Sequence, residues 1–459
     1  MSMRIEYDSV GGLEVPKDAY YGISALRAKN NFYMTGYGLH TLMINNLAAI
    51  KKAAALVNCE IGDLDKERCD AICKACDEVM EGKFHDSFIV DALQGGAGTS
   101  ANMNANEVIA NRAIEILGGE KGDYNIVHPN DHVNMSQSTN DVFPTAGKLT
   151  ALQLSVRVVD ELSRLHEVFI SKAKEFDDII KMGRTQLQDA VPIRLGQEFA
   201  AYASAIARDI IRIKRVFGDL RAINLGGTAI GTGINAAPEY RKRIAGKLDE
   251  VTGLEVRSAD DLIDATQNLD VFVNVSSVVK TCAVSLSKIS NDLRLISSGP
   301  KTGFGEINLP PVQNGSSIMP GKINPVIPEV VSQIAFDIIG NDLTITMAAE
   351  GGQLELNAFE PIIFCNLFSS LEILANGIKT LTDNCVVGIT ANREHCEKLL
   401  ASSASLATAL CPYIGYKKST EIAKQVVRTG LDVKNIVLRE KLLDEKTLEK
   451  ILDPYAVTE

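Results

Sequence analysis

The sequence predicts a mainly α-helical protein in which long helices pack into a central bundle. The segment from Lys148 to Met182 runs for 35 residues without glycine or proline. As one helix it would extend about 50 Å, at roughly 1.5 Å per residue. Between Ser258 and Ser298, two interleaved series of apolar residues recur at steps of seven, a seam typical of helices that pack side by side. The two series are Ala265, Phe272, Val279, Leu286 and Leu293, and Val275, Cys282, Ile289 and Ile296.

Helices of this length cannot bury an apolar face alone, so we expect a bundle and association into a homo-oligomer. Shorter helices flank the bundle, and from about Cys396 the segments become short and charged. We therefore expect a mixed, mostly helical N-terminal domain at 1–137, a central long-helix domain at 138–395 and a small helical domain at 396–459. Besides the two long segments, the predicted helices are Ile44–Val57, Leu64–Met80, Ala101–Leu117, a run from after Pro192 to Phe217, Pro328–Glu350 and Pro361–Lys379.

Composition and charge exclude several classes of function. Of the 459 residues, 46% are hydrophobic and 23% are charged, which is ordinary for a globular protein. The net charge of -11 disfavours a nucleic-acid-binding face, although a local cleft can still attract an anion. We find no signal-like apolar region at the N-terminus and no uninterrupted apolar run that would span a bilayer. Nine cysteines without a secretion signal then favour reduced thiols, so we expect a cytoplasmic protein with neither nucleic-acid nor membrane partners.

A loop shaped by glycine and proline carries the first candidate site. Residues 315–325 read GSSIMPGKINP and bring together Ser316, Ser317, Lys322 and Asn324. Asn324 is expected to cap the next helix and Pro325 to begin it. The positive end of that helix and the Lys322 ammonium would then favour a carboxylate or a phosphate. An ordinary interhelix loop before a capped helix fits the same residues, and this alternative remains open from residue types alone.

Three further polar turns lie at the ends of predicted helices. They contain Gly98-Thr99, Ser138-Thr139-Asn140 and Thr185-Gln186. Each is poor in carboxylates and rich in hydroxyl, amide and N–H groups, which suits an anion with several oxygens, such as a small dicarboxylate. Taken singly, each is explained by helix capping, for which Thr99 or Ser100 is a candidate. No G-x-S-x-G, H-E-x-x-H or Walker sequence is present, and no histidine adjoins Ser316, so a hydrolase triad is not indicated.

These four turns resemble the motifs of the aspartase/fumarase superfamily, and the resemblance covers nearly the whole chain. Residues 315–324 match its signature G-S-S-x-M-P-x-K-x-N at every fixed position. The sequences GGAGTSANMN at 95–104, NDHVNMSQSTNDVFP at 130–144 and GRTQLQDAVP at 183–192 are similar as well. S-T-N-D at 138–141 and V-I-P-E at 326–329 look like the aspartase branch, since class II fumarases usually have S-S-N-D. Gln186 departs from the histidine of fumarases and some aspartases, so a proton-relay role at this turn is in doubt.

The resemblance implies reversible deamination of L-aspartate to fumarate and ammonia, by anti elimination through an enediolate. Ser316 would be the general base on a mobile loop, and Lys322 would add the positive potential that a serine alkoxide needs. Preorganised donors would stabilise the doubly charged enediolate. By the same resemblance, Thr99, Ser138, Thr139 and Ser317 would bind the β-carboxylate, Lys322 and Asn324 the α-carboxylate, and Asn140, Thr185 and Gln186 the amine.

The resemblance implies no organic cofactor and no obligatory catalytic metal, and it leaves activation by a divalent cation open. Members of the family are homotetramers with a helical core, and each active site takes its turns from three chains. The expected partners are therefore the small-molecule substrate and further copies of this chain. Two alternatives remain: a class II fumarase that interconverts malate and fumarate, and a catalytically silent helical scaffold.

Overall fold

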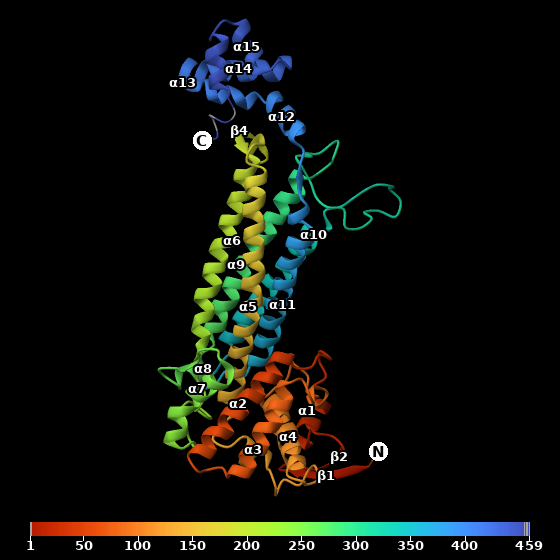
Figure 1. Ribbon diagram of the computed structural model, residues 1–459, viewed down its shortest axis with the longest axis vertical. Coiled ribbons are helices and arrows are strands. Elements are labelled where there is room, and N and C mark those ends of the chain that lie inside the picture. The colour runs from red at the N-terminus through yellow and green to blue at the C-terminus, as the bar shows by residue number, and fades with distance from the viewer. Residues whose placement is uncertain (1, 454, 456–457, 459) are drawn as a thin grey trace. The chain divides into compact units, whose positions relative to one another are not determined.

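The computed structural model describes residues 2–453, 455 and 458 and confirms the predicted mainly α-helical class (Figure 1). The chain forms two compact units. The first contains the residues up to Val159 together with Ile211–Thr281 and Phe336–Leu374. The second contains Asp160–Ile210, Cys282–Ala335 and the residues from Ala375 on. The three-part division at 137 and 395 stays a prediction.

Short helices and small two-stranded sheets make up most of the first unit. Its sheets are an antiparallel hairpin and a short parallel pair. Its elements are β1 (Met3–Asp8), β2 (Gly11–Pro16), α1 (Ile23–Asn31), α2 (Thr41–Glu60), α3 (Lys66–Met80), η1 (His85–Ser87), α4 (Thr99–Ile116), the π-helical η2 (Pro129–Val133), η3 (Gly218–Arg221), β5 (Ala222–Ile223), α7 (Pro238–Thr252), β6 (Arg257–Ser258) and α8 (Asp264–Gln267).

Long helices contribute segments to both units and pack side by side in each. They are α5 (Thr139–Glu175), α6 (Leu195–Phe217), α9 (Asp270–Ile296), α10 (Val326–Glu350) and α11 (Glu360–Asn384). In the first unit, the ring of Phe364 on α11 lies 5.3 Å from Phe143 on α5 and 5.1 Å from Phe272 on α9, between centroids. In the second unit, Tyr202 on α6 donates to Asp292 on α9 at 3.1 Å. The central bundle expected from the sequence is therefore present.

The seam of apolar residues at steps of seven is confirmed along α9. Its buried members are Phe272, Val275, Val279, Cys282, Leu286, Ile289, Leu293 and Ile296. The helix begins at Asp270 and not near Ser258, so Ala265 lies in the separate short helix α8 and is only half-buried. Because buried apolar residues recur at steps of seven, they form one face of α9, and this face packs against the neighbouring helices.

The long helix predicted over Lys148–Met182 begins and ends earlier than expected. α5 runs from Thr139 to Glu175 and includes Pro144. Proline has no N–H to give the carbonyl four residues before it, which usually ends a helix. Here that carbonyl, the main-chain oxygen of Asn140, accepts a hydrogen bond from the Asn224 side chain at 3.0 Å. A partner from a distant segment thus replaces the missing helical bond and lets the helix start before the proline.

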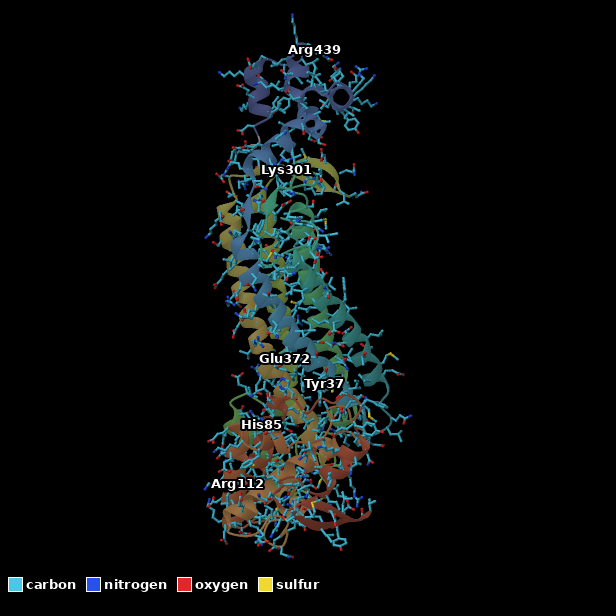
Figure 2. All side chains as sticks on the ribbon, turned by 90° about the vertical axis from the view of Figure 1, so that its right-hand side faces the viewer. Tyr37, His85, Arg112, Lys301, Glu372 and Arg439 are labelled. Carbon is cyan, nitrogen blue, oxygen red and sulfur yellow. The ribbon has the colours of Figure 1, made fainter. Side chains whose placement is uncertain are left out.

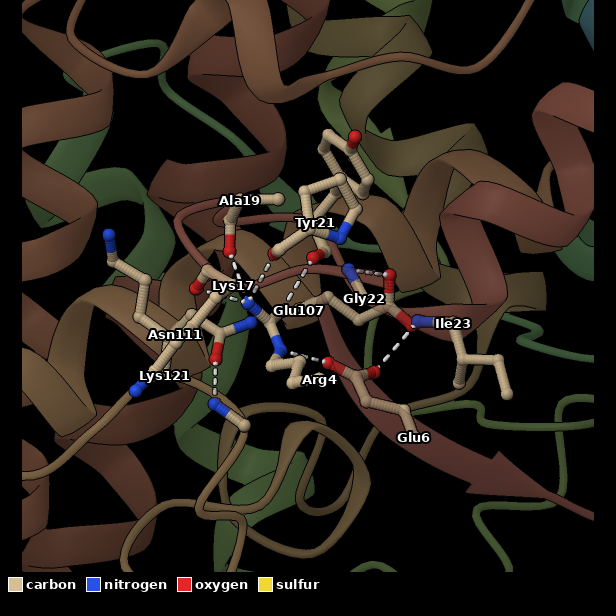
Figure 3. Close-up of polar contacts among 12 residues, drawn as sticks. Arg4, Glu6, Lys17, Ala19, Tyr21, Gly22, Ile23, Glu107, Asn111 and Lys121 are labelled. Carbon is tan, nitrogen blue, oxygen red and sulfur yellow. Dashed lines mark hydrogen bonds and ion pairs between the residues drawn. The ribbon is translucent and has the colours of Figure 1, made fainter. Parts of the chain in front are cut away.

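Two buried carboxylates hold the start of α1 (Figure 3). Glu107 accepts from the N–H groups of Gly22, Ser24 and Ala25 at 2.7–3.1 Å, and Glu6 accepts from Ile23 N at 2.8 Å. Gly22 has no room for a side chain, because a Cβ there would lie 2.8 Å from both carboxylates. Arg4 bonds Glu6 and four backbone carbonyls between Pro16 and Tyr21. These contacts fix the N-terminal segment on α4.

The second unit ends in a small helical cluster with its own apolar core. The core includes Leu410, Ile422, Ile436 and Leu448. The segment Glu360–Gly388, which contains α11, is long and apolar enough to cross a membrane, but 61% of its apolar window is buried inside the protein, as in a bundle core. The remaining elements are β3 (Ile180–Thr185), β4 (Gln188–Arg194), β7 (Ile307–Asn308), η4 (Val386–Gly388), β8 (Thr390–Ala391), α12 (Arg393–Ser402), η5 (Ala404–Leu410), α13 (Cys411–Ile414), α14 (Tyr416–Thr429), α15 (Val433–Arg439) and α16 (Glu445–Ile451).

Candidate active site

The turn at Gly98-Thr99 places an exposed hydroxyl at the start of a helix. Gly98 has a φ of 86°, and a Cβ there would lie 2.3 Å from the Phe143 ring, so only glycine fits. The predicted cap at Thr99 or Ser100 is wrong, because Gly98 takes the capping position and Thr99 is the first helical residue. The Thr99 hydroxyl donates to Gly96 O at 2.7 Å. The side chain of Gln94, which sequence reasoning did not single out, accepts from Ala101 N instead.

A buried carboxylate, that of Asp141, fixes the backbone of the turn Ser138-Thr139-Asn140. Asp141 accepts from Ser138 N at 2.9 Å, and from Gly226 N and Thr228 N at 3.0 and 2.9 Å. Burial raises the pKa of Asp141 to about 6. The loop that supplies two of these donors was not predicted to belong to the site, although its glycines at 226 and 227 were a usable signal. It fixes the backbone on which the three polar side chains stand.

Within the turn, each predicted ligand keeps a group for a substrate. Ser138 Oγ accepts from Asn140 N at 3.2 Å, which leaves its own hydrogen free to donate. Asn140 donates through Nδ2 to Ala229 O at 2.7 Å, so its Oδ1 is oriented as an acceptor suited to an amine. Thr139 begins α5 and accepts from Asn102 on α4 at 3.1 Å. The starts of α4 and α5 are thereby tied together, and helix N-termini favour anions.

Thr185 and Gln186 lie at the exposed tip of the β3–β4 hairpin. Thr185 pairs with Gln188, so Gln186 and Leu187 form a two-residue turn. Both central residues have positive φ, 53° and 62°, as in a type I′ turn. Such turns prefer asparagine and glycine, and each residue forced into this conformation costs about 1–3 kcal/mol. A strained, exposed polar tip is typical of a functional position.

The signature loop closes on itself at a narrow neck. Gly315 N donates to Lys322 O at 2.9 Å, and Asn324 Nδ2 donates to Gly315 O at 2.7 Å. A Cβ on Gly315 would lie 2.4 Å from Lys322 O, so the neck requires glycine. The predicted helix start at Pro325 is wrong by one residue, because α10 begins at Val326, and the Asn324 side chain closes the neck rather than capping the helix. The neck thus joins Gly315, which directly precedes Ser316, to Lys322 through their backbones.

The Ser316 oxygen already sits among hydrogen-bond donors. Ser316 Oγ accepts from Ile318 N at 3.2 Å and from Met319 N at 3.0 Å. Donors to an oxygen stabilise its anionic form and so favour an alkoxide. Ser316 is half-buried, whereas Ser317 and Lys322 are exposed. The loop thus presents one preorganised oxygen together with a free-standing hydroxyl and an ammonium.

A buried charge network joins Glu306, which directly precedes β7, to the β3–β4 hairpin. Glu306, which is 0% exposed, forms ion pairs with Arg184 at 2.7 Å and with Lys181 at 2.9 Å. Lys181 also pairs with Glu198 at 2.7 Å, so two cations face two carboxylates. The Arg184 guanidinium lies 4.2 Å from the centre of the Phe304 ring. Arg184 directly precedes Thr185, so the network positions the hairpin end of the candidate site.

The candidate residues are divided between the two units. The first unit carries Thr99, Ser138, Thr139 and Asn140, and the second carries Thr185, Gln186, Ser316, Ser317, Lys322 and Asn324. Within the second unit, no hydrogen bond between described residues joins Thr185 or Gln186 to residues 315–324. Nor do the described residues contain a group of three or more His, Cys, Asp or Glu side chains arranged to hold a metal ion.

A large cavity in the first unit is lined by other residues. Its volume is ≈ 420 Å³, and it is lined mainly by apolar side chains that include Phe143, Phe364 and Phe368. Tyr37 and Glu372, which are labelled in Figure 2, also line it. None of the predicted site residues is among its lining residues, so it is not the candidate active site.

Comparison with known families supports the motif assignment. A family model described as Lyase matches residues 11–340, and one described as Fumarase C C-terminus matches residues 406–459. The fold and the four turns therefore define a lyase, and the chain belongs to the aspartase/fumarase superfamily.

Individual relatives refine this class. The chain is 52% identical to an aspartate ammonia-lyase of Bacillus subtilis over 99% of this chain and 96% of that protein. It is 53% identical to the aspartate ammonia-lyase of Pseudomonas aeruginosa over 99% and 96%. A solved fumarate lyase:delta crystallin from Brucella melitensis superposes with a TM-score of 0.97 at 50% identity, over the full length of both chains. A class II fumarase from Schistosoma mansoni has a TM-score of 0.95 at 35% identity, over 99% and 98%.

Proposed function

We propose that this chain catalyses the reversible deamination of L-aspartate to fumarate and ammonia, as a carbon–nitrogen lyase. The observation that carries the proposal is the full-length identity of 52–53% to aspartate ammonia-lyases, against 35% to a class II fumarase. S-T-N-D at 138–141 agrees with this branch. Elimination proceeds anti, through an enediolate formed when a proton leaves the carbon beside the β-carboxylate.

Ser316 is the proposed general base. A serine hydroxyl is a weak base, and its alkoxide needs positive potential and removal from water. The N–H groups of Ile318 and Met319 donate to Ser316 Oγ and support that potential, and Lys322 is joined to the same neck. Closure of the loop over the substrate would exclude water.

The remaining residues are proposed to bind the two carboxylates and the amine. Helix starts at Thr99 and Thr139, with Ser138 and Ser317, supply hydroxyl and N–H donors for the β-carboxylate and the enediolate. The second hydrogen of Asn324 Nδ2 and the Lys322 ammonium fit the α-carboxylate, since Asn324 uses only one hydrogen on Gly315 O. Asn140 Oδ1 faces the amine, with Thr185 and Gln186.

A homotetramer with sites shared by three chains is part of the proposal, as is a cytoplasmic location without an organic cofactor or obligatory metal. Within the first unit, α10 exposes an apolar row at helical spacing. Its members Phe336, Ile339, Leu343 and Met347 are 64%, 41%, 62% and 65% exposed. An apolar stripe of this kind is suited to packing against another copy of the chain.

Incubation of the purified protein with L-aspartate and with L-malate, side by side, tests the substrate. We expect aspartate to yield fumarate, followed by its ultraviolet absorbance, and an equal amount of ammonia. Turnover of malate but not aspartate would assign the chain to class II fumarases. Inactivity with both, in a correctly folded protein, would favour the silent scaffold.

A further inference from the structure

A lysine in the interior of the first unit has its whole ammonium group bound by amides. Lys51 on α2 is 0% exposed. Its Nζ donates to Asn102 Oδ1 at 2.7 Å, to Asn134 Oδ1 at 2.8 Å and to Gln137 Oε1 at 2.9 Å. An ammonium has three hydrogens, and these three neutral oxygens accept all of them. No part of the proposed mechanism uses this residue.

The lysine determines which way the Asn102 amide points. An ammonium only donates, so the Asn102 atom facing Lys51 must be the oxygen and the amide N–H₂ must face the other way. Asn102 Nδ2 donates to Thr139 Oγ1 at 3.1 Å and to Asn134 Oδ1 at 3.2 Å. Because Thr139 Oγ1 accepts from Asn102, the hydroxyl hydrogen is directed away from that amide. Through the Asn102 side chain, Lys51 thus leaves the Thr139 hydroxyl hydrogen available to donate to another group.

The positive charge of Lys51 is poorly compensated. Burial lowers the pKa of Lys51 to about 7, and the carboxylate that opposes this is Asp141. The Asp141 carboxylate accepts hydrogen bonds from the backbone N–H groups of Ser138, Gly226 and Thr228 and none from Lys51. A buried charge acts strongly over short distances in a medium of low dielectric constant. A dianion formed beside Thr139 would supply the missing counter-charge.

We propose that Lys51 is a positioning residue that acts through Asn102, orienting and polarising the Thr139 hydroxyl toward the developing enediolate. The inference rests on the proposed function, because it assigns the β-carboxylate to Thr139. The charge on that carboxylate rises from one to two as the enediolate forms, so Lys51 stabilises the transition state more than the bound substrate.

The test is a double-mutant cycle between Lys51→Met and Thr139→Val, measured on the full-length protein. Lys51→Met alone should lower kcat about 10- to 100-fold, below the effect of losing a direct oxyanion donor. The Ki of succinate, a dicarboxylate without a leaving group, should rise less than about threefold, because it reports ground-state binding. In the Thr139→Val background, adding Lys51→Met should lower kcat by less than about threefold. If Lys51→Met lowers kcat by the same factor in the wild-type protein and in the Thr139→Val protein, the proposal is overturned.

A second buried lysine provides the matched control. Lys148 is 6% exposed and donates to Ala222 O at 2.7 Å, without contact to Thr139. Lys148→Met should lower the unfolding temperature but leave the kcat of the folded protein within about twofold. If Lys148→Met lowers kcat as much as Lys51→Met does, loss of a buried ammonium alone explains the effect and the proposal fails.

Asn102→Ala covers the case in which Lys51→Met does not fold. It breaks the same link while keeping the ammonium, and it should show the same non-additivity with Thr139→Val. A folded Asn102→Ala protein with unchanged kcat would contradict the inference. If the wild-type protein turns over malate and not aspartate, the proposed function fails separately. The cycle is then run with malate, whose dehydration also passes through an enediolate.

Discussion

Replacing Ser316 with alanine should lower kcat for L-aspartate by about 10²–10⁴-fold, the range expected for loss of a general base. Ser316 Oγ accepts two N–H groups inside the signature loop, and the substitution removes the one oxygen that these donors prepare. The fold should survive, because the neck at Gly315 is closed by backbone and Asn324 bonds that do not involve the serine hydroxyl. Initial rates and circular dichroism of the purified variant provide the measurement.

Thr302→Ala is the matched control for this prediction. Thr302 is exposed in the same stretch between α9 and α10, and it has no assigned role in the site. Its hydroxyl should be dispensable, with kcat unchanged within about twofold. If the Ser316→Ala protein keeps the wild-type kcat, Ser316 is not the general base. The assignment of the chain as a lyase would be unaffected by that result.

Replacing Glu306 with glutamine should lower the free energy of unfolding by about 3–5 kcal/mol, because the buried Lys181 and the partly buried Arg184 lose their shared carboxylate. Lys181 would retain Glu198, but Arg184 would face a neutral amide in place of its ion-pair partner at 2.7 Å. Since Arg184 directly precedes Thr185, activity should fall even where the protein remains folded. Urea unfolding and initial rates at low temperature measure the two effects.

Asp178→Asn is the corresponding control at the surface of the same unit. Its partner Arg393 lies 2.6 Å away, with side chains 45% and 62% exposed for Arg393 and Asp178. Solvent screens such a pair, so the variant should lose less than about 1 kcal/mol. A loss of unfolding free energy from Glu306→Gln no greater than that from Asp178→Asn would show that the network does not stabilise the hairpin.

Local patterns were sufficient to predict the long helices of the bundle, although not all of their ends, and the motifs. The apolar repeat of α9 is confirmed from Phe272 to Ile296 because burial of one face imposes its own period on the sequence. The signature loop was found from its residues alone, because all of its defining residues lie in one short segment. The neck of the loop requires glycine at position 315, so this constraint is visible in the local sequence. The roles assigned to the four turns remain predictions.

Features that depend on distant partners were missed. The start of α5 before Pro144 requires Asn224, which lies 84 residues from Asn140. Lys51 and Lys52 look alike in an alanine-rich helix, yet Lys52 pairs with Asp77 while Lys51 is fully buried. The hydrogen-bond partners of Lys51 are residues 102, 134 and 137, and the sequence around Lys51 contains no pattern that predicts them.

The central claim is that turns carried by the two units of different chains form one ammonia-lyase site. The most direct measurement mixes Ser316→Ala protein with Thr139→Ala protein, lets the subunits exchange, and assays fumarate formation from aspartate. If each site takes Ser316 and Thr139 from different chains, random mixing leaves about a quarter of the sites intact, so about a quarter of wild-type activity should return. Activity that stays at the level of the two separate variants, after exchange has been verified by mass, would contradict the account.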